Sequence, residues 1–292
     1  MSAAIEVSGL VKTYGELRAV DGVDLSVPTG QCVALLGPNG AGKTTTVEIL
    51  EGYRSRDSGD VRVLGSDPQH ADRAWRARIG IVLQQVSDLQ DLTVEESVRH
   101  FAGYYANPRD PLQVVAAVGL TEKTRARVRN LSGGQRRRLD VALGIIGRPE
   151  LLFLDEPTTG FDPEARREFW GLIDSLKTEG TTILLTTHYL EEAEALADSV
   201  AVINRGRVVA AGDTAGLGGR HAGLATVTWQ EDGAVRSVST ATPTQVVSEL
   251  SARFAGGEIP QLQVLRPTLE DTYLSLVEHD PHRPAALEEG AA

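Results

Sequence analysis

Short apolar runs alternate with amphipathic segments along the first two hundred residues of the chain. The clearest run is Cys32 to Leu36, which is almost continuously apolar, ends in a glycine-rich turn and predicts a buried strand. The segment Lys43 to Glu51 predicts a helix that ends at Gly52. Ile5 to Val7 and Leu25 to Val27 are predicted as short strands. The chain therefore begins with strands, a turn and a helix.

In the middle of the chain the spacing of hydrophobic residues changes from the alternation of strands to the period of helices. Asp60 to Leu64 alternates between polar and apolar residues, as an edge strand does, and Ile79 to Leu83 is a further strand that leads to Gln84. From Thr93 to Leu120 the apolar residues recur with helical spacing. This region predicts a helical insert over about residues 93–130.

Strand and helix alternate again after the insert. The pattern predicts a helix capped by Ser132, a strand, a second helix and a second strand, over residues 132–146, 151–155, 163–176 and 181–186. Strands that alternate with helices form a largely parallel sheet joined by crossovers. We therefore expect an α/β fold.

Past Asp198 the pattern differs. A hairpin is predicted over 199–211, and the glycine-rich stretch 212–223 is typical of a domain boundary. Strands and helices then alternate in a compact α+β order, with strands at 224–229, 234–239 and 261–265 and helices at 244–254 and 269–277. We expect a first domain over 1–220, a small α+β accessory domain over 221–278, and a disordered tail over 279–292.

Length and composition are those of an ordinary globular protein. The chain has 292 residues, 41% of them hydrophobic and 24% charged. No apolar run approaches the roughly 18 to 20 residues that span a bilayer, so any membrane role must depend on a partner. The N-terminus has neither a basic start nor a long apolar stretch, which favours a cytosolic location. The single cysteine, Cys32, lies in an apolar run and is interpreted as a core residue.

The charge balance argues against binding to nucleic acid. The formal net charge is −11, whereas non-specific nucleic-acid binding needs clustered lysines and arginines. The one basic run, Arg136 to Arg138, is interpreted as a solvated helix face. We expect no nucleic-acid partner.

A phosphate-binding loop is the first candidate site. Residues 37–44 match the P-loop pattern, lie directly after a buried strand and open a helix. In this context backbone N–H groups and the helix N-terminus bind phosphates, Lys43 reaches the β- and γ-phosphates, and the Thr44 hydroxyl ligates Mg²⁺. A glycine-rich structural turn is the alternative. The nucleotide-binding residues expected here are Gly37, Pro38, Asn39, Gly40, Ala41, Gly42, Lys43, Thr44 and Thr45.

Two carboxylates end the strand at residues 151–155. Asp155 and Glu156 stand at the carboxyl edge of the predicted sheet, where ligands of open α/β sheets bind. Asp155 is expected to hold Mg²⁺ through its water shell. Glu156 is expected to act as general base toward the attacking water. The alternative is a solvated strand end.

The motif Leu131 to Gln135, with sequence LSGGQ, resembles the signature of ATP-binding cassette (ABC) transporters at every position. The order and spacing of the P-loop, this motif, the strand with Asp155 and Glu156, and His188 also match the nucleotide-binding subunit of that family. The resemblance covers about residues 3–220. It implies an ABC ATPase cassette in which Ser132 and Gly134 contact the γ-phosphate bound by a second subunit. A capped surface helix is the alternative for this motif.

The same resemblance implies further site residues. Gln84 matches the family's glutamine loop, which senses Mg²⁺ and the water and precedes the insert that takes the membrane partner. His188 resembles the switch histidine that contacts the γ-phosphate, and Tyr14 lies where the family stacks an aromatic ring on adenine. Asp162 sits in the family's dimer loop, where Phe161 replaces the commoner leucine. Each could instead be an ordinary core or surface residue.

Within the family, the stretches at residues 158–163, 187–193 and 267–274 look like the daunorubicin-resistance type of ATPase that serves ABC-2 exporters. This resemblance implies a subunit that uses ATP and Mg²⁺, pairs with a separate ABC-2 type permease and a second ATPase subunit, and drives export of a hydrophobic drug, lipid or polysaccharide. It implies a homodimer that is peripheral on the inner face of the membrane, with antibiotic resistance as an outcome.

Two other functions are compatible with parts of the sequence. An ABC importer ATPase shares every catalytic motif, so only the C-terminal segment and an accompanying binding protein separate import from export. A non-transport ABC ATPase would have a long coiled-coil insert or two cassettes, and the chain has neither pattern. We expect export.

Overall fold

The computed structural model describes residues 2–82, 89–214, 216–217, 224–266 and 268–278. Contacts along the chain divide it into two compact units, Met1–Ala211 and Gly212–Ala292, and each is described by itself. None of the helices in the described residues is long and apolar enough to cross a membrane.

A six-stranded sheet forms the centre of the first unit. Its order is β5-β6-β7-β3-β8-β9, and the pairs from β5 to β8 are parallel. The predicted strands after the P-loop all form, with β8 and β9 joined through a tight turn in which Arg205 and Gly206 both have positive φ, the geometry of a hairpin turn. The strands are β3 (Cys32–Leu36), β5 (Ile79–Val82), β6 (Leu151–Asp155), β7 (Thr182–Thr186), β8 (Ser199–Asn204) and β9 (Arg207–Asp213).

A separate antiparallel sheet forms at the N-terminus. Its strands are β1 (Ala3–Tyr14), β2 (Leu17–Pro28) and β4 (Ser58–Val63), in the order β2-β1-β4. The pattern predicts only short strands at 5–7 and 25–27, whereas β1 and β2 have 12 residues each because they pair along their whole length. One cluster of buried residues joins both sheets to the helix after β3, and it includes Ile5, Val20, Leu35, Leu50 and Phe153.

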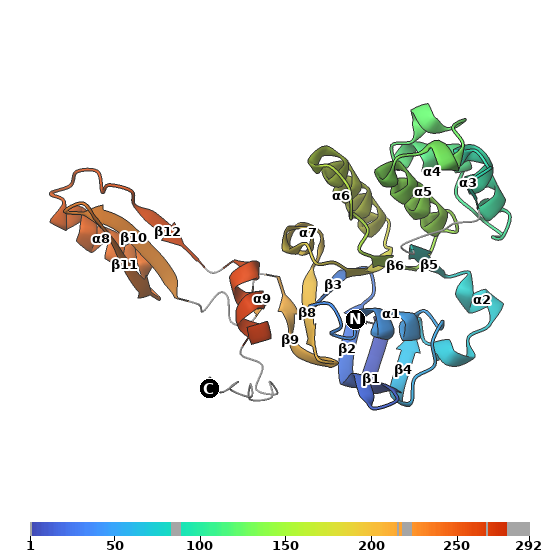
Figure 1. The fold of residues 1–292 in the computed structure, drawn as a ribbon, viewed down its shortest axis with the longest axis horizontal. Coiled ribbons are helices and arrows are strands. Elements are labelled where there is room, and N and C mark those ends of the chain that lie inside the picture. The colour runs from blue at the N-terminus through green and yellow to red at the C-terminus, as the bar shows by residue number, and fades with distance from the viewer. Residues whose placement is uncertain (1, 83–88, 215, 218–223, 267, 279–292) are drawn as a thin grey trace, which may run out of the picture. The chain divides into compact units, whose positions relative to one another are not determined.

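Seven α-helices of the first unit lie in the described residues. They are α1 (Lys43–Leu50), α2 (Arg73–Arg76), α3 (Val94–Ala102), α4 (Pro111–Ala117), α5 (Gly133–Ile145), α6 (Pro163–Thr178) and α7 (Leu190–Leu196). The helical insert predicted from Thr93 is confirmed by α3 and α4, which pack with α5 (Figure 1). No helix is predicted from the sequence at α7, which is therefore an addition that the structure makes.

The second unit has its own small core. Strands β10 (Ala225–Glu231), β11 (Ala234–Thr240) and β12 (Gln263–Leu265) form an antiparallel sheet in the order β11-β10-β12. The unit also contains α8 (Pro243–Arg253) and α9 (Leu269–Glu278). Val227, Leu250 and Ile259 are buried together, with Trp229 and Phe254 packed against them. The strands and helices expected from 224 to 277 are all present. An independent role for this segment stays a prediction, and the predicted tail at 279–292 lies outside the described residues.

Candidate nucleotide site

The P-loop connects the end of β3 to the start of α1. Gly42 caps this helix with φ of 104°, a conformation that favours glycine. A Cβ atom there would lie 2.4 Å from the backbone oxygen of Ala19, so the close approach to β2 also requires glycine. At Gly37 a Cβ atom would lie 2.2 Å from the backbone oxygen of Ile203. The loop is therefore held tightly between β2 and the end of β8.

Lys43 is buried inside this loop. Its Nζ donates to the backbone oxygens of Gly37 at 2.7 Å and Pro38 at 3.1 Å. Burial lowers the pKa of the Lys43 ammonium, and the nearby carboxylates of Glu156 and Asp155 oppose this shift. The side chain thus sits where the loop backbone, the predicted magnesium ligand Asp155 and the predicted base Glu156 converge.

A cavity of about 470 Å³ joins several of the predicted site residues. It lies where β1 and β2 approach the P-loop and the carboxyl end of β6. This position agrees with the rule that open α/β sheets bind ligands beyond the carboxyl ends of their strands. The lining residues are Tyr14, Leu17, Ala19, Asn39, Gly40, Gly42, Lys43, Thr44, Thr45, Asp155 and Glu156. The remaining P-loop residues, Gly37, Pro38 and Ala41, are not among the residues that line it.

Asp155 and Glu156 differ in their surroundings. The Thr186 hydroxyl donates to Oδ1 of Asp155, and the backbone N–H of Glu156 donates to the oxygen of Thr186 at 2.9 Å. Glu156 has a left-handed backbone with φ of 47°, which is unusual for a residue other than glycine. Its Oε1 lies 3.3 Å from Nδ1 of His188, so the predicted base and switch histidine are neighbours.

Tyr14 lines the cavity and is itself exposed to solvent. Its side chain is 39% exposed, and Lys12 and Arg54 approach its ring at 5.7 Å and 5.3 Å from the centroid. An exposed aromatic ring is suited to stacking on a flat base. The adenine contact predicted for Tyr14 stays a prediction.

The signature residues do not line this cavity. The Ser132 hydroxyl accepts from the backbone N–H of Gln135, and the Gln135 side chain accepts from the N–H of Ser132, a complete capping box at the start of α5. Gly134 lies in the first turn of the same helix. Asp162 caps α6 by accepting from Ala165 N–H at 2.8 Å. Their predicted contacts with a second subunit remain untested, and Gln84 lies outside the described residues.

Sequence comparisons identify the family. A family model described as ABC transporter matches residues 20–159. Over 219 residues the chain is 46% identical to the daunorubicin/doxorubicin resistance ATP-binding protein DrrA of Streptomyces peucetius, covering 73% of this chain and 66% of that protein. The daunorubicin resistance ATP-binding protein DrrA3 of Streptomyces coeruleorubidus is 38% identical over 306 residues, covering 95% of this chain and 96% of that protein. The chain belongs to the ABC transporter family.

Another ABC relative comes from outside the streptomycetes. Nod factor export ATP-binding protein I of Ralstonia nicotianae is 47% identical over 214 residues, covering 71% of this chain and 66% of that protein. The chain thus spans 66% of the length of both this relative and the S. peucetius protein.

Solved ABC structures agree with the fold. An ATP-binding subunit of an ABC transporter is 27% identical with a TM-score of 0.67, covering 73% of this chain and 90% of that chain. A dimeric ATP-binding cassette in a post-hydrolysis state, bound to ADP and Pi, is 23% identical with a TM-score of 0.66 and shows the shared fold, covering 72% of this chain and 98% of that chain. The predicted P-loop ABC ATPase cassette is confirmed.

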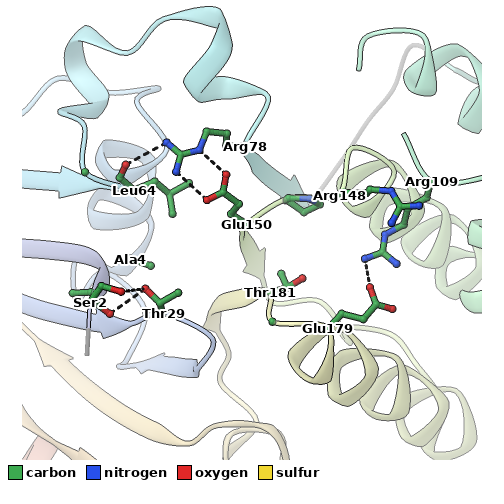
Figure 2. Close-up of a pocket in the computed structure, with 14 residues that line it drawn as sticks. Ser2, Ala4, Thr29, Leu64, Arg78, Arg109, Arg148, Glu150, Glu179 and Thr181 are labelled. Carbon is green, nitrogen blue, oxygen red and sulfur yellow. Dashed lines mark hydrogen bonds and ion pairs between the residues drawn. The ribbon is translucent and has the colours of Figure 1, made fainter. Parts of the chain in front are cut away.

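A larger cavity of this ABC cassette, about 630 Å³, lies away from the P-loop at the amino ends of β6 and β7 (Figure 2). Two of its arginines are paired, Arg78 with Glu150 and Arg109 with Glu179. No P-loop residue lines it, and the amino ends of parallel strands are not where such sheets bind ligands. The smaller cavity is therefore the better candidate for the nucleotide.

Three residues near the nucleotide cavity are not among the site residues predicted from the sequence. The interpretation of Arg136 to Arg138 as a solvated helix face is wrong for Arg137, which is only 7% exposed because its guanidinium packs inside against the backbone at the end of β6. Thr186 holds Asp155, Arg137 donates to the backbone around Glu156, and Glu51 is buried close enough to Asp155 to interact with its charge. Burial, followed by the charges of Asp155 and Glu48, raises the pKa of Glu51 to about 8. None belongs to a motif, and only the folded arrangement places them beside the site.

Proposed function

We propose that this chain binds and hydrolyses ATP at the 470 Å³ cavity and thereby powers export through a separate membrane permease. The observation that carries the proposal is the convergence of Lys43, Asp155 and Glu156 on one cavity formed by the P-loop and the end of β6. Phosphoryl transfer needs phosphate binding, charge compensation and a positioned water, and these three side chains are the types that supply them.

The P-loop would bind the phosphates of ATP. Backbone N–H groups of Gly40 and Gly42 and the N-terminus of α1 favour negative charge. Lys43 adds a buried positive charge that its loop already orients through two hydrogen bonds. Tyr14 would stack on the adenine at the outer end of the cavity. The ATP molecule would therefore extend from its adenine at Tyr14 to its γ-phosphate near Glu156.

The residues present fit a magnesium ion that arrives with the nucleotide. Thr44 and Asp155 line the same cavity, and hydroxyl and carboxylate oxygens are ligands that Mg²⁺ accepts. Within the described ranges no cluster of three or more His, Cys, Asp or Glu side chains could hold a metal, which fits an ion that takes most of its ligands from phosphate and water. When bound, Mg²⁺ would neutralise charge on the β- and γ-phosphates. Gln84 is the further ligand expected from the sequence.

Glu156 would accept a proton from the attacking water. It follows Asp155 directly at the end of β6, and its carboxylate lines the cavity. His188 does not line the cavity, but its Nδ1 lies 3.3 Å from Oε1 of Glu156, where the imidazole can orient the carboxylate. Its contact with the γ-phosphate would follow once ATP is bound. This pairing supports the roles predicted for both residues.

A second ATPase subunit would complete the site. Ser132 and Gly134 open α5 with exposed or half-exposed positions, and neither lines the cavity of its own chain. A helix N-terminus suits contact with a phosphate, so we place these residues against the γ-phosphate of a second copy. Asp162, which caps α6, would lie at the same subunit interface.

The relatives favour export over import. The names of three relatives refer to daunorubicin resistance or Nod factor export. By analogy, the cargo would be a hydrophobic drug, a lipid or a polysaccharide, and the membrane partner a permease of the ABC-2 type. A subunit that consumes ATP for such a permease would be cytoplasmic and peripheral on the inner face of the membrane.

The test of this function is the change of Glu156 to Gln. General acid–base help is typically worth about 10² to 10⁴ in rate, so Glu156→Gln should lose at least about 100-fold in ATP turnover while it still binds ATP. Glu191→Gln changes an exposed carboxylate on α7 and is the matched control, with unchanged turnover. Near-normal turnover of Glu156→Gln would remove Glu156 from this role.

Export is tested separately in cells. The chain and its candidate permease are expressed together, and accumulation of daunorubicin is measured. Lower accumulation that returns to the control level in Glu156→Gln supports ATP-driven export. Unchanged accumulation beside normal ATP turnover would reject this drug as cargo and leave the ATPase assignment intact.

A further inference from the structure

The backbone of Glu156 has to be held in place. Its φ of 47° lies in the left-handed region, which costs energy for any residue with a Cβ atom. Such a conformation persists only when surrounding contacts enforce it. The N–H of Glu156 donates to the oxygen of Thr186 at 2.9 Å, and the oxygen of Glu156 accepts from the N–H of Thr159 at 3.4 Å. The carbonyl oxygens of the two flanking residues have a further partner.

Arg137 supplies contacts on both sides of Glu156. Its guanidinium Nη2 donates to the backbone oxygen of Asp155, and its Nε donates to the backbone oxygen of Pro157 at 3.3 Å. The planar fork of an arginine can donate to both carbonyls at once, whereas an ammonium acts as a point charge. The two flanking carbonyls are therefore bridged by one rigid group.

The environment of Arg137 shows that this contact is an internal one. The side chain is 7% exposed and comes from the second turn of α5. Burial lowers the pKa of its guanidinium, while the nearby carboxylates of Asp140, Asp155 and Glu156 oppose that shift. A charge is thus kept inside the protein at the end of β6, in contact with backbone rather than in water.

We infer that Arg137 is a positioning residue that holds the Glu156 backbone in its left-handed turn and so aims the Glu156 carboxylate into the nucleotide cavity. The inference rests on the role proposed above for Glu156. Arg137 also lies five positions after Ser132, on the helix that the signature motif opens. A displacement of α5 at the subunit interface would move the base of the same chain.

The first test replaces Arg137 with Met, which keeps an unbranched apolar stem but removes both donors. Misplacing a catalytic group by about 1 Å can cost about 100-fold, so we expect kcat for ATP to fall about 10- to 100-fold. KM and the affinity for ATP should stay within about twofold, because the P-loop is untouched. Arg137→Lys should recover only part of kcat, since one ammonium does not reproduce the fork. Arg138→Met changes the next residue of α5 and removes its ion pair with Glu168 of α6, so it is the matched control and should keep kcat.

The second test separates positioning from a general loss of stability. If Arg137 acts through Glu156, the double variant Arg137→Met/Glu156→Gln should turn over ATP within about twofold of Glu156→Gln alone. Single-turnover assays with labelled ATP measure these slow rates. Additive losses, or a normal kcat in Arg137→Met, would overturn the inference. If Arg137→Met does not fold, Arg137→Gln, which retains one amide donor, is used in the same cycle.

The outcomes distinguish this inference from the proposed function. A Glu156→Gln variant with normal turnover refutes the role of Glu156 itself. A slow Glu156→Gln beside a fast Arg137→Met refutes only the role of Arg137. ATP binding is measured for each variant, because a variant that still binds ATP has a folded cassette.

Discussion

Glu51 should make the stability of the cassette depend on pH between about 5 and 8. The residue follows α1, is 9% exposed, and lies near the carboxylates of Asp155 and Glu48. Burial is the main cause that raises the pKa of Glu51 from 4.5 to about 8, and the two like charges add to it. The folded protein therefore binds a proton on Glu51 that the unfolded chain has already released.

The direction of the effect follows from linkage. A carboxyl group whose pKa is higher in the folded state contributes its full stability below its unfolded pKa of 4.5 and loses it as the pH rises through about 8. One pKa unit is worth about 1.4 kcal/mol, so the loss at high pH is at most about 5 kcal/mol. Relaxation of the surroundings and entry of water would reduce this figure, and we expect at least about 2 kcal/mol.

The assay compares the free energy of unfolding of the parent chain and Glu51→Gln in urea at pH 5, 6, 7, 8 and 9. Glutamine keeps the shape of the side chain and cannot ionise. The variant should be close to the parent at pH 5 and gain relative stability at each step up to about pH 8. Glu122→Gln changes an exposed carboxylate and should give a difference that does not vary with pH. If the difference in free energy of unfolding between Glu51→Gln and the parent also does not vary with pH, the reasoning is refuted.

Three other predictions concern the nucleotide and the assembly. Lys43→Ala should weaken ATP binding at least about 10-fold in titration calorimetry, because it removes the buried ammonium from the phosphate loop; unchanged affinity would contradict its role. Glu156→Gln with ATP and Mg²⁺ should be a dimer by light scattering, and Ser132→Arg should abolish both dimer and hydrolysis. A monomer with normal turnover would rule out the two-subunit site. A chain of residues 1–214 should bind ATP with similar affinity but lose permease pairing or drug resistance in cells, if the segment beyond it is an assembly module. A large loss of melting temperature together with lost ATP binding would show that the segment only stabilises the cassette.

Local patterns in the sequence predict most of the helices and strands, and they predict the site residues that lie within contiguous motifs. The run Cys32 to Leu36, the glycines after it and the helix from Lys43 are contiguous, so the order of residues alone determines that a strand, a phosphate loop and a helix follow one another. The same is true of the strand that ends at Asp155 and of the capping box at Ser132. Backbone hydrogen bonding and side-chain periodicity act within such segments, and they need no tertiary contact to be recognised.

The arrangement of these segments is decided by the tertiary structure. The N-terminal strands form a sheet of their own, which places Tyr14 at the nucleotide cavity, and the sheet order sets β7 beside β6 so that Thr186 reaches Asp155. The burial of Glu51 and the contact of Arg137 with the backbone at Asp155 likewise depend on which elements pack together. Each of these contacts joins residues distant in sequence or alters the solvation of a charge. Such effects arise only when the core closes, because burial and long-range distances are properties of the packed fold and not of any one segment.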